Sequence, residues 1–359
     1  MNGTMLREIH LAGTPYAMGL EHGRQLQTQV HHLALERYEL ARAFAEAHGV
    51  PLTRQQCEEM ARQHLQLHSP DVIEEWQGIA DGAELPIEDV FFANALTDFQ
   101  DVLWQSASAE VHGCTSFLVA PDASQDGHPL IGQTWDMHAS AEPVIAIFHR
   151  TPDNGPRSLV LSTAGCLTLI GVNEAGLCVG NNNLRPTDAE PGIIYLALLH
   201  QALAQDNWDD ACDALTADGR ASGHNYLVGE AGGRLADIET TAGEHEIFPL
   251  DSGTYIHTNH YLSDRLQALE DPHQDQSSTR HRLERARQRL AAEEQPVTPD
   301  GLRQALADHD GDHLSICRHG TGRDVRSCAF VVADPVDRCI WARLGPPCEG
   351  PLDKYSLQA

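Results

Sequence analysis

The sequence changes character within residues 112–137, which read HGCTSFLVAPDASQDGHPLIGQTWDM. Two apolar runs, residues 115–120 and 130–133, are separated by Pro, Asp, Ser and Gly residues, which favour turns. The stretch therefore predicts two paired strands. Cys114 opens the first strand, and Asp136 stands at the end of the second.

Upstream of this stretch, the apolar residues recur with the period of helices. Leucine, valine and aromatic residues return every three or four positions between residues 16 and 48. Further helices are expected at residues 54–67, at residues 71–80 and after Pro86, where acidic residues occupy the first turn. We therefore expect roughly the first 110 residues to be helical.

Downstream, short runs rich in Val, Ile and Phe alternate with turn-forming residues. The expected strands are residues 144–149, 158–162, 167–172, 177–180, 226–229, 234–239, 254–257, 329–333 and 339–343. The expected helices are residues 193–204 and 208–217, residues 277–292, and a short one after Pro299. Helices followed by a mostly antiparallel body indicate an α+β fold.

The composition excludes several classes of protein. The chain has 359 residues, with 24 Lys and Arg against 52 Asp and Glu, so its formal charge is 24 − 52 = −28. Nucleic acids and anionic membrane surfaces would repel such a protein, so neither is expected as a partner. The longest apolar run, Ile193–Leu199, is far shorter than the roughly 20 residues that cross a bilayer. No basic segment followed by an apolar one opens the chain, so we expect a cytoplasmic protein.

One of the nine cysteines stands in a setting suited to nucleophilic chemistry. No CxxC pair occurs, which argues against a disulfide framework and a zinc ribbon, and most of the cysteines should be small buried apolar residues. Cys114 differs because Gly113 places no side chain beside the peptide bond that joins them. Attack of the thiol on that bond would free an α-amino group with a pKa of about 7.7–8.0, a base next to the nucleophile.

The stretch at residues 112–137 resembles the self-processing acyl-coenzyme A:6-aminopenicillanic acid acyltransferase family, within the N-terminal-nucleophile hydrolases. Further similar motifs follow the family's order along nearly the whole chain. They are GTPYAMGLEHG (13–23), EEWQGIADGAELPIEDVFFANALTDF (74–99), GVNEAGLCVGNNNL (171–184), IHTNHYL (256–262), SSTRHRLERARQRL (277–290), SICRHG (315–320) and VVADPVDRCIWARLGPPC (331–348). Each motif is weak alone, whereas the ordered series is specific.

The resemblance implies a fold and a maturation step. The fold would be a four-layer αββα sandwich of the N-terminal-nucleophile hydrolase type, preceded by a helical prosegment. Cleavage after Gly113 would leave residues 1–113 and residues 114–359 as two chains of one heterodimer, and further oligomerisation stays open. Cys114 would then be the N-terminal nucleophile.

Carried over position by position, the resemblance also implies the catalytic groups. Asp136 would orient the α-amino group of Cys114. Asn259 would donate to the oxyanion, because an amide NH2 is a neutral fixed donor. A second asparagine, either Asn182 or Asn183, would line the same hole.

Two further positions bear on substrate binding. Related bile-salt and penicillin V hydrolases carry an arginine three residues before the aspartate, where this chain has Gln133. This departure is expected to remove a cation from the site. Trp135 would lie beside the nucleophile, either as a core residue or as a substrate contact.

The expected reaction is hydrolysis of a small linear amide through a Cys114 thioester. The substrate classes are an N-acyl amine, an N-acyl amino acid or the side-chain amide of a β-lactam. The alternative is an acyl-CoA-dependent N-acyltransferase, which is less favoured because no basic cluster for the coenzyme A phosphates is visible and the net charge opposes binding. No cofactor is expected.

Two other classes of protein were weighed against this hypothesis. A metal-dependent hydrolase could use His257 with His260, the segment DHDGDH at residues 308–313, or His319. The segment lacks the glycine position of an EF-hand, and the first two histidines lack the i, i+4 spacing of an HExxH helix, so no metal is expected. A non-catalytic acidic binding protein is the second class, and the charged residues 277–292 are explained by a solvated helix.

Overall fold

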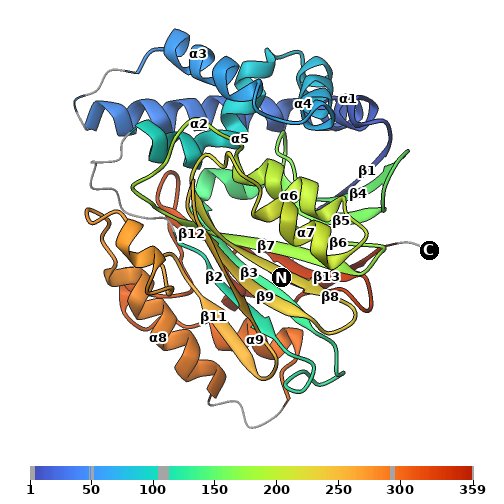
Figure 1. Cartoon of the computed structure of the whole chain (residues 1–359), viewed down its shortest axis with the longest axis vertical. Coiled ribbons are helices and arrows are strands. Elements are labelled where there is room, and N and C mark those ends of the chain that lie inside the picture. Colours follow the sequence, from blue (N-terminus) through green and yellow to red (C-terminus); the bar gives the residue numbers. More distant parts are fainter. Residues whose placement is uncertain (1–4, 48, 50–51, 104–112, 292–295, 358–359) are drawn as a thin grey trace.

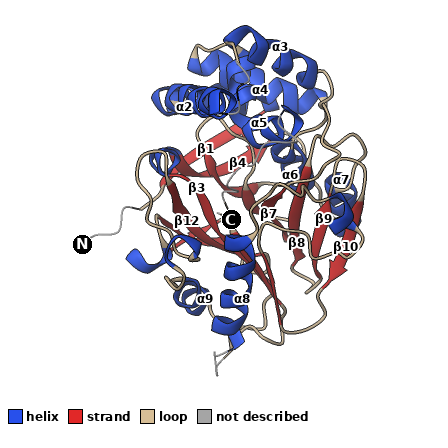
Figure 2. Cartoon of the chain, turned by 90° about the vertical axis from the view of Figure 1, so that its left-hand side faces the viewer, coloured by secondary structure: helices blue, strands red, loops and turns tan. Residues whose placement is uncertain are grey.

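The computed structural model describes residues 5–47, 49, 52–103, 113–291 and 296–357. Two β-sheets lie face to face in the middle of the molecule, and helices cover the outer face of each sheet (Figure 1, Figure 2). Ile131 in one sheet and Leu227 in the other belong to the main apolar cluster. The expected α+β fold, a four-layer αββα sandwich, is confirmed.

The larger sheet has eight strands in the order β1-β4-β5-β6-β7-β8-β9-β10. Their bounds are β1 (Arg7–Gly13), β4 (Ile145–Pro152), β5 (Ser158–Thr163), β6 (Ile170–Asn173), β7 (Leu177–Leu184), β8 (Gly223–Glu230), β9 (Leu235–Thr240) and β10 (His245–Pro249). Neighbouring strands are antiparallel except β1 and β4, which are parallel. Helices α6 (Tyr195–Leu203) and α7 (Trp208–Leu215) pack on this sheet.

The smaller sheet has six strands in the order β11-β2-β3-β12-β13-β14. Their bounds are β2 (Thr115–Val119), β3 (Leu130–His138), β11 (Thr254–His257), β12 (Val325–Asp334), β13 (Cys339–Leu344) and β14 (Asp353–Ser356). Helices α8 (Ser277–Ala291) and α9 (Pro299–Leu306) cover its outer face. Phe117 and Phe330 of the sheet share an apolar cluster with Leu283 and Leu302 of these helices. The predicted pair of strands around residues 112–137 is therefore the β2–β3 hairpin.

The N-terminal part of the chain forms a helical layer across one end of both sheets (Figure 1). It comprises α1 (Pro15–Gln25), α2 (Gln27–Ala47), α3 (Arg54–Leu65), α4 (Pro70–Ala83) and α5 (Ile87–Leu103). Local signals set the starts of these helices. Thr53 and Gln56 form a reciprocal capping box before α3, and proline occupies the first turn of α1 and α4. Short 3₁₀ turns occur elsewhere: η1 (Ala139–Val144), η2 (Leu266–Leu269), η3 (Asp312–Leu314) and η4 (Pro347–Glu349).

The first element is a strand, so the expectation of an entirely helical N-terminal part was wrong at β1. Ile9 and Leu11 of β1 are buried and alternate with exposed residues, which is the period of a strand. β1 pairs in parallel with β4, for example at Ile9 and Phe148. The N-terminal part of the chain therefore contributes an edge strand to the larger sheet.

Four glycines allow helices α1 and α4 to pack with their backbones in contact. They are Gly19 and Gly23 on α1 and Gly78 and Gly82 on α4, spaced four residues apart on each helix. A methyl group on Gly19 would lie 2.1 Å from the backbone oxygen of Glu75, which is inside van der Waals contact. The two helices can approach this closely because no side chains stand between them.

A buried ion pair links this helical layer to the sheet below it. Arg150 of β4 donates two hydrogen bonds to Glu75 of α4, with N–O distances of 2.6 and 2.7 Å. His200 of α6 lies 3.4 Å from the same carboxylate. Burial raises and the neighbouring cations lower the pKa of Glu75, and the net effect is a pKa well below the ordinary value. Along the described chain, no helix combines the length and the apolar character needed to cross a bilayer.

Candidate active site

Cys114 lies directly before β2, at the wall of a cavity of about 260 Å³. Helices α2, α5 and α6 contribute to the walls of this cavity, together with strands β3, β7 and β8. Cys114 is 8% exposed, so its thiol is close to the surface of the cavity and shielded from bulk water. Its position follows from the β2–β3 hairpin, which brings Asp136 of β3 next to the start of β2.

The Cys114 thiol accepts a hydrogen bond from the backbone N–H of Asp136, with an N–S distance of 3.4 Å. Burial raises the pKa of this thiol to about 12, and the negative charge of Asp136 acts in the same direction. The guanidinium groups of Arg282 and Arg318 oppose the shift. In the uncleaved chain the thiol is therefore protonated at neutral pH.

Asp136 is fully buried, and burial raises its pKa above the ordinary value. The guanidinium of Arg318 lies 3.9 Å from the Asp136 carboxylate and lowers the pKa again. Arg318 is itself held in place, because its backbone N–H donates to the hydroxyl of Ser327 on β12. The carboxylate thus shares a buried site with a cation that comes from a different part of the chain.

Arg282 of α8 also reaches Cys114. Its guanidinium donates to the carbonyl oxygen of Cys114 at 2.6 Å, to the Thr115 hydroxyl at 3.1 Å and to Oδ1 of Asn259 at 2.9 Å. Burial lowers the pKa of Arg282 to about 9, so the group still carries its charge at neutral pH. Although position 133 carries glutamine, two arginines distant in sequence, Arg282 and Arg318, supply positive charge beside Asp136 and Cys114.

Gly113 has no room for a side chain. A methyl group at this position would lie 2.0 Å from Nη2 of Arg282 and 2.5 Å from Oδ1 of Asn259. The backbone of Gly113 lies outside the left-handed region, so space and not conformational freedom explains the glycine. Residues 104–112, including His112 of the quoted stretch, lie outside the described residues.

Asn259 follows β11 and is held by four neighbours. Its Oδ1 accepts from Arg282, which can only donate, so the orientation of the amide is fixed. The NH2 group donates to the backbone oxygen of Asn183 at 2.9 Å. The backbone N–H of Asn259 donates to the Thr279 hydroxyl, and its carbonyl accepts from Gln274. The NH2 group has a second hydrogen, which remains for another acceptor.

The asparagines of β7 point in alternate directions because successive side chains of a strand lie on opposite faces. Asn181 and Asn183 line the cavity. Asn182 faces the other way, where its Oδ1 accepts hydrogen bonds from the Ser116 hydroxyl and from the amide of Asn225. The sequence did not decide whether Asn182 or Asn183 lines the oxyanion hole. Of these two residues, only Asn183 lines the cavity.

Gln133 and Trp135 also differ in placement. Trp135 lines the cavity beside Cys114 and is almost completely buried. Gln133 is not among the lining residues, and its Oε1 accepts from the backbone N–H of Asn181 at 3.0 Å. Gln133 therefore joins β3 of one sheet to β7 of the other and does not reach the cavity.

Arg37 of α2 places a further cation in the cavity wall, which the sequence analysis missed. Its side chain is 6% exposed and donates to the sulfur of Met137 at 3.3 Å. Within the described residues, no carboxylate forms an ion pair with Arg37. Arg185 also lines the cavity, but its guanidinium lies 2.9 Å from the Asp271 carboxylate, which balances its charge. Arg37 is one of several polar residues on a long amphipathic helix, so periodicity alone could not single it out.

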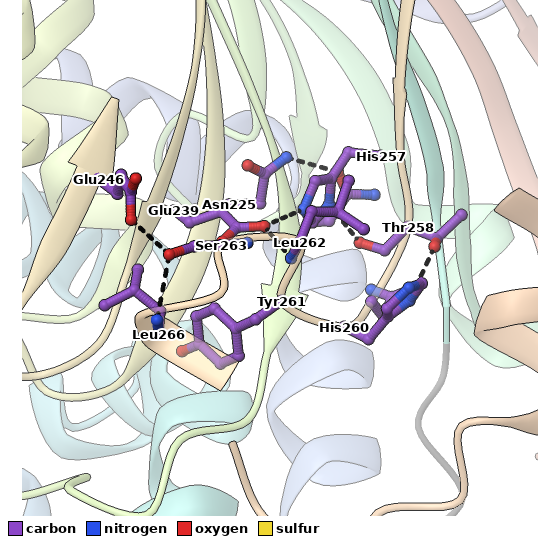
Figure 3. Close-up of polar contacts among 12 residues, drawn as sticks. Asn225, Glu239, Glu246, His257, Thr258, His260, Tyr261, Leu262, Ser263 and Leu266 are labelled. Carbon is purple, nitrogen blue, oxygen red and sulfur yellow. Dashed lines mark hydrogen bonds and ion pairs between the residues drawn. The ribbon is translucent and has the colours of Figure 1, made fainter. Parts of the chain in front are cut away.

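A network of buried polar groups holds the loop that follows β11 and contains Asn259 (Figure 3). The Glu239 carboxylate accepts from Nε2 of His257 at 2.7 Å and from the backbone N–H groups of Leu262 and Ser263. Nδ1 of His257 lies 2.7 Å from the Thr258 carbonyl oxygen. Both ring nitrogens face oxygen acceptors, and nearby carboxylates raise the pKa of His257 despite burial. The imidazole, which contacts an oxygen at each ring nitrogen, therefore fixes the loop.

The same loop contains His257 and His260, which the sequence offered as possible ligands of one metal ion. Nδ1 of His260 lies 3.0 Å from the Thr279 hydroxyl and 3.3 Å from that of Thr258, so its contacts are separate from those of His257. The side chains of the two histidines thus contact different groups, Glu239 for His257 and Thr279 for His260.

Comparison with known proteins places the chain in a family. Residues 123–349 match the sequence profile of the family described as "Acyl-coenzyme A:6-aminopenicillanic acid acyl-transferase", a match that begins after Cys114. A protein of Emericella nidulans, "Acyl-coenzyme A:6-aminopenicillanic-acid-acyltransferase 40 kDa form", is 26% identical over 93% of this chain and 91% of its own length.

Two solved structures are also similar. The Caenorhabditis elegans N-acylethanolamine-hydrolyzing acid amidase ortholog is 14% identical, with 62% of this chain and 93% of that chain covered and a TM-score of 0.45. Penicillin V acylase from Agrobacterium tumefaciens is 14% identical, with 68% of this chain and 86% of that chain covered and a TM-score of 0.43. Because the profile spans more than half of the 359 residues, the chain belongs to the acyl-coenzyme A:6-aminopenicillanic acid acyltransferase family.

Proposed function

We propose that this protein is a self-processing cysteine amidohydrolase whose nucleophile is Cys114. The observation that carries the proposal is the surrounding of Cys114. It borders a cavity, Asp136 and Arg282 donate hydrogen bonds to it, and Asn259 accepts a hydrogen bond from the same Arg282. These are the groups that acyl transfer to a thiol requires: a carboxylate, a fixed amide donor and a cation.

Maturation begins with attack of the Cys114 sulfur on the carbonyl carbon of Gly113. The C–N bond breaks, the thiol proton passes to the departing nitrogen, and a thioester joins Gly113 to the Cys114 side chain. Water then hydrolyses the thioester, which gives a carboxylate on Gly113 and a free thiol and amino group on Cys114. The lack of room for a side chain at Gly113, beside Arg282 and Asn259, supports a glycine at the cleaved bond.

Turnover uses the same groups on an external amide. The new α-amino group takes the thiol proton, and the sulfur attacks the amide carbonyl of the substrate. The second N–H of the Asn259 amide donates to the oxyanion, and Asn183, whose backbone oxygen accepts from the other N–H, lines the cavity. The amine leaves with a proton, and water opens the thioester to release the acid. Asp136 orients the amino group in both half-reactions.

Arg37 favours a substrate that carries a carboxylate. A buried guanidinium without an anionic partner is unfavourable, and an anion in the cavity would compensate it. N-acyl amino acids and the side-chain amides of β-lactams carry such a carboxylate, whereas N-acyl amines do not. We therefore infer that an N-acyl amino acid or a related acylated acid is the substrate.

Acyl transfer to an amine is the second candidate, supported by the family and by the Emericella nidulans relative. In that reaction an amine replaces water as the attacking group on the thioester. The net charge of −28 opposes recognition of the coenzyme A phosphates, which favours hydrolysis. Product analysis with added amines separates the two reactions, since a transferase forms new amides and a hydrolase forms the free acid.

The test of the proposal combines mass analysis with an amide screen. The purified protein should contain chains of 113 and 359 − 113 = 246 residues, the second beginning at Cys114. Cys114→Ala should remain uncleaved and inactive, whereas Cys212→Ala, on α7 and outside the cavity lining, should be cleaved and active. A fully active single chain of 359 residues would rule the proposal out.

A further inference from the structure

We propose that His309, Cys317, His319 and Cys348 bind a structural zinc ion. The four ligand atoms all lie within 4.8 Å of one another. Two imidazoles and two thiols form the Cys2His2 set that is typical of structural zinc sites. None of the four residues lines the cavity beside Cys114.

The distances within the cluster fit a tetrahedral zinc ion. Nε2 of His319 lies 3.6 Å from Sγ of Cys317, 3.3 Å from Sγ of Cys348 and 3.0 Å from Nε2 of His309. Zinc bonds of about 2.3 Å to sulfur and 2.0–2.1 Å to nitrogen give tetrahedral N–S and N–N distances of about 3.6 and 3.3 Å. The three distances from Nε2 of His319 therefore lie within a few tenths of an ångström of these values.

A carboxylate orients one of the histidines. Oε1 of Glu349 lies 3.3 Å from Nδ1 of His319, and the Glu349 carboxylate is itself bound by Arg326 at 3.2 Å. With the ring proton on Nδ1, facing this carboxylate, Nε2 of His319 is unprotonated and directed at the two thiols. Zinc-binding histidines commonly have such a carboxylate partner, which fixes the tautomer and raises the basicity of the ligand.

Two separate loops supply the ligands, and each is anchored apart from the cluster. The backbone N–H of Cys317 donates to the Asp308 carbonyl, and the Asp308 carboxylate is bound by Arg285 of α8 at 2.6 Å. Cys348 lies in η4, where Arg303 of α9 donates to the Pro347 carbonyl at 2.7 Å. Cys317 is buried while the other three residues are exposed, so an ion can enter from solvent.

Two other groups of potential ligands differ from this one. Asp237, Glu239 and His257 are completely buried, and Glu239 and His257 already satisfy each other and the adjacent backbone. In the group of His128, Asp334 and Asp337, the histidine and Asp334 form an ion pair at 2.8 Å. Neither group contains a sulfur ligand.

The ion would also hold a residue of the active site. Arg318, which lies 3.9 Å from Asp136, stands in the chain between the ligands Cys317 and His319. Four protein ligands leave no open position for substrate or water, so the role is structural. No metal was expected from the sequence, where His309 within residues 308–313 and His319 matched no metal-binding motif, and only the fold brings Cys348 to the other three residues.

The experiment measures zinc in the full-length protein, purified under reducing conditions and freed of loosely bound metal by gel filtration. We expect about one zinc ion per chain, or uptake of one on titration with zinc chloride. Cobalt substitution should give the visible bands and the sulfur-to-metal charge transfer of a tetrahedral thiolate site. Cys348→Ser and His309→Gln, both at exposed positions, should each lower the zinc content, whereas His128→Gln and Cys212→Ser should leave it unchanged.

Three results would overturn the proposal. The first is reduced wild-type protein that neither contains nor takes up zinc. The second is a zinc content that is the same in wild type, Cys348→Ser and His309→Gln, which means adventitious binding. The third is a Cys317–Cys348 disulfide found by peptide mapping of the protein purified with reductant. Circular dichroism of each variant shows whether it is folded, and the wild-type measurement decides the question even if one variant is not.

Discussion

At the scale of single residues, Asn259 and Arg282 form the part of the site on which the proposed chemistry depends most. Arg282 contacts the carbonyl of the nucleophile and the side chain of the oxyanion donor at the same time. A change at Asn259 that removed this contact would leave a buried guanidinium hydrogen without an acceptor, at a cost of about 1–3 kcal/mol. The informative variant therefore keeps the acceptor and removes only the donor.

Asn259→Asp meets this condition. The aspartate can still accept from Arg282 at 2.9 Å, but it has no NH2 group for the oxyanion. Turnover should fall by about 10²–10³-fold, as expected for loss of one oxyanion donor, and the melting temperature should also fall, because the Asn183 carbonyl loses its donor and faces a carboxylate oxygen. Steady-state kinetics and calorimetry check both parts. Activity within a few-fold of wild type would remove Asn259 from the oxyanion hole.

Arg37→Met tests the inferred carboxylate on the substrate. Methionine keeps an unbranched side chain and removes the charge, so an acylated amino acid loses a charge-assisted hydrogen bond worth about 1.5–3 kcal/mol. The kcat/KM for that substrate should fall by roughly 10–100-fold. An N-acyl amine of the same acyl group is the control, and its kcat/KM should hardly change. An equal loss for both amides would mean that Arg37 shapes the cavity without recognising charge.

At the scale of secondary-structure elements, the close glycine contacts between α1 and α4 predict whether a substitution there stabilises or destabilises the protein. Alanine is a better helix former than glycine by about 1 kcal/mol, so Gly19→Ala in a free helix surface would stabilise the protein. Here the added methyl would meet the Glu75 backbone at 2.1 Å, which forces the helices apart. We expect Gly19→Ala to destabilise the protein by about 1–3 kcal/mol.

Urea denaturation measures the effect on Gly19→Ala. Gly243→Ala is the matched control, since a methyl there would have only an ordinary contact, 3.6 Å from the Asp188 carboxylate. A stabilised Gly19→Ala variant would contradict this prediction and show that α1 and α4 can separate without a loss of stability.

Some of these elements could be predicted from the sequence, and others depended on information that a local pattern does not contain. The helical period identifies the N-terminal helices, and the turn residues identify the β2–β3 hairpin. β1 was missed because its two buried residues give a short alternation directly before a long helical run. Arg282 is one of five arginines on α8, and only packing against β2 distinguishes it from the others.

At the scale of the whole molecule, neutral histidines join the N-terminal helices to the body. The ring of His22 accepts a hydrogen bond from the Gly165 N–H at 2.8 Å, and the ring of His68 accepts one from the Ile194 N–H at 3.1 Å. Burial lowers the pKa of each histidine to about 4. Protonation would remove the acceptor and place a charge in the interface between the two parts.

The stability of the protein should therefore fall in acid. Above pH 6.5, His22 and His68 are neutral in both folded and unfolded chains, so they cause no pH dependence. Below pH 6.5 the unfolded chain binds protons at these histidines, whereas the folded chain does not. The free energy of unfolding therefore drops by up to roughly 1.4 kcal/mol per pH unit for each histidine until about pH 4. Melting temperatures between these limits check the slope, and His22→Gln with His68→Gln should make it shallower. An unchanged slope in the double variant would assign the acid sensitivity to other groups.

The edge strand β1 matters for any attempt to express the chain from Cys114 onward directly, without the proposed cleavage. An open reading frame that starts at Cys114 would supply the nucleophile with its free amino group after removal of the initiator methionine. The product would lack β1, so the backbone of β4 would be an unpaired edge next to an uncovered apolar surface, an arrangement that promotes aggregation between copies. A second reading frame for residues 1–113, expressed in the same cell, would cap that edge in trans. The N-terminal part of the chain would thus stay bound to the part that begins at Cys114 after the proposed cleavage, because it supplies the edge strand of the larger sheet.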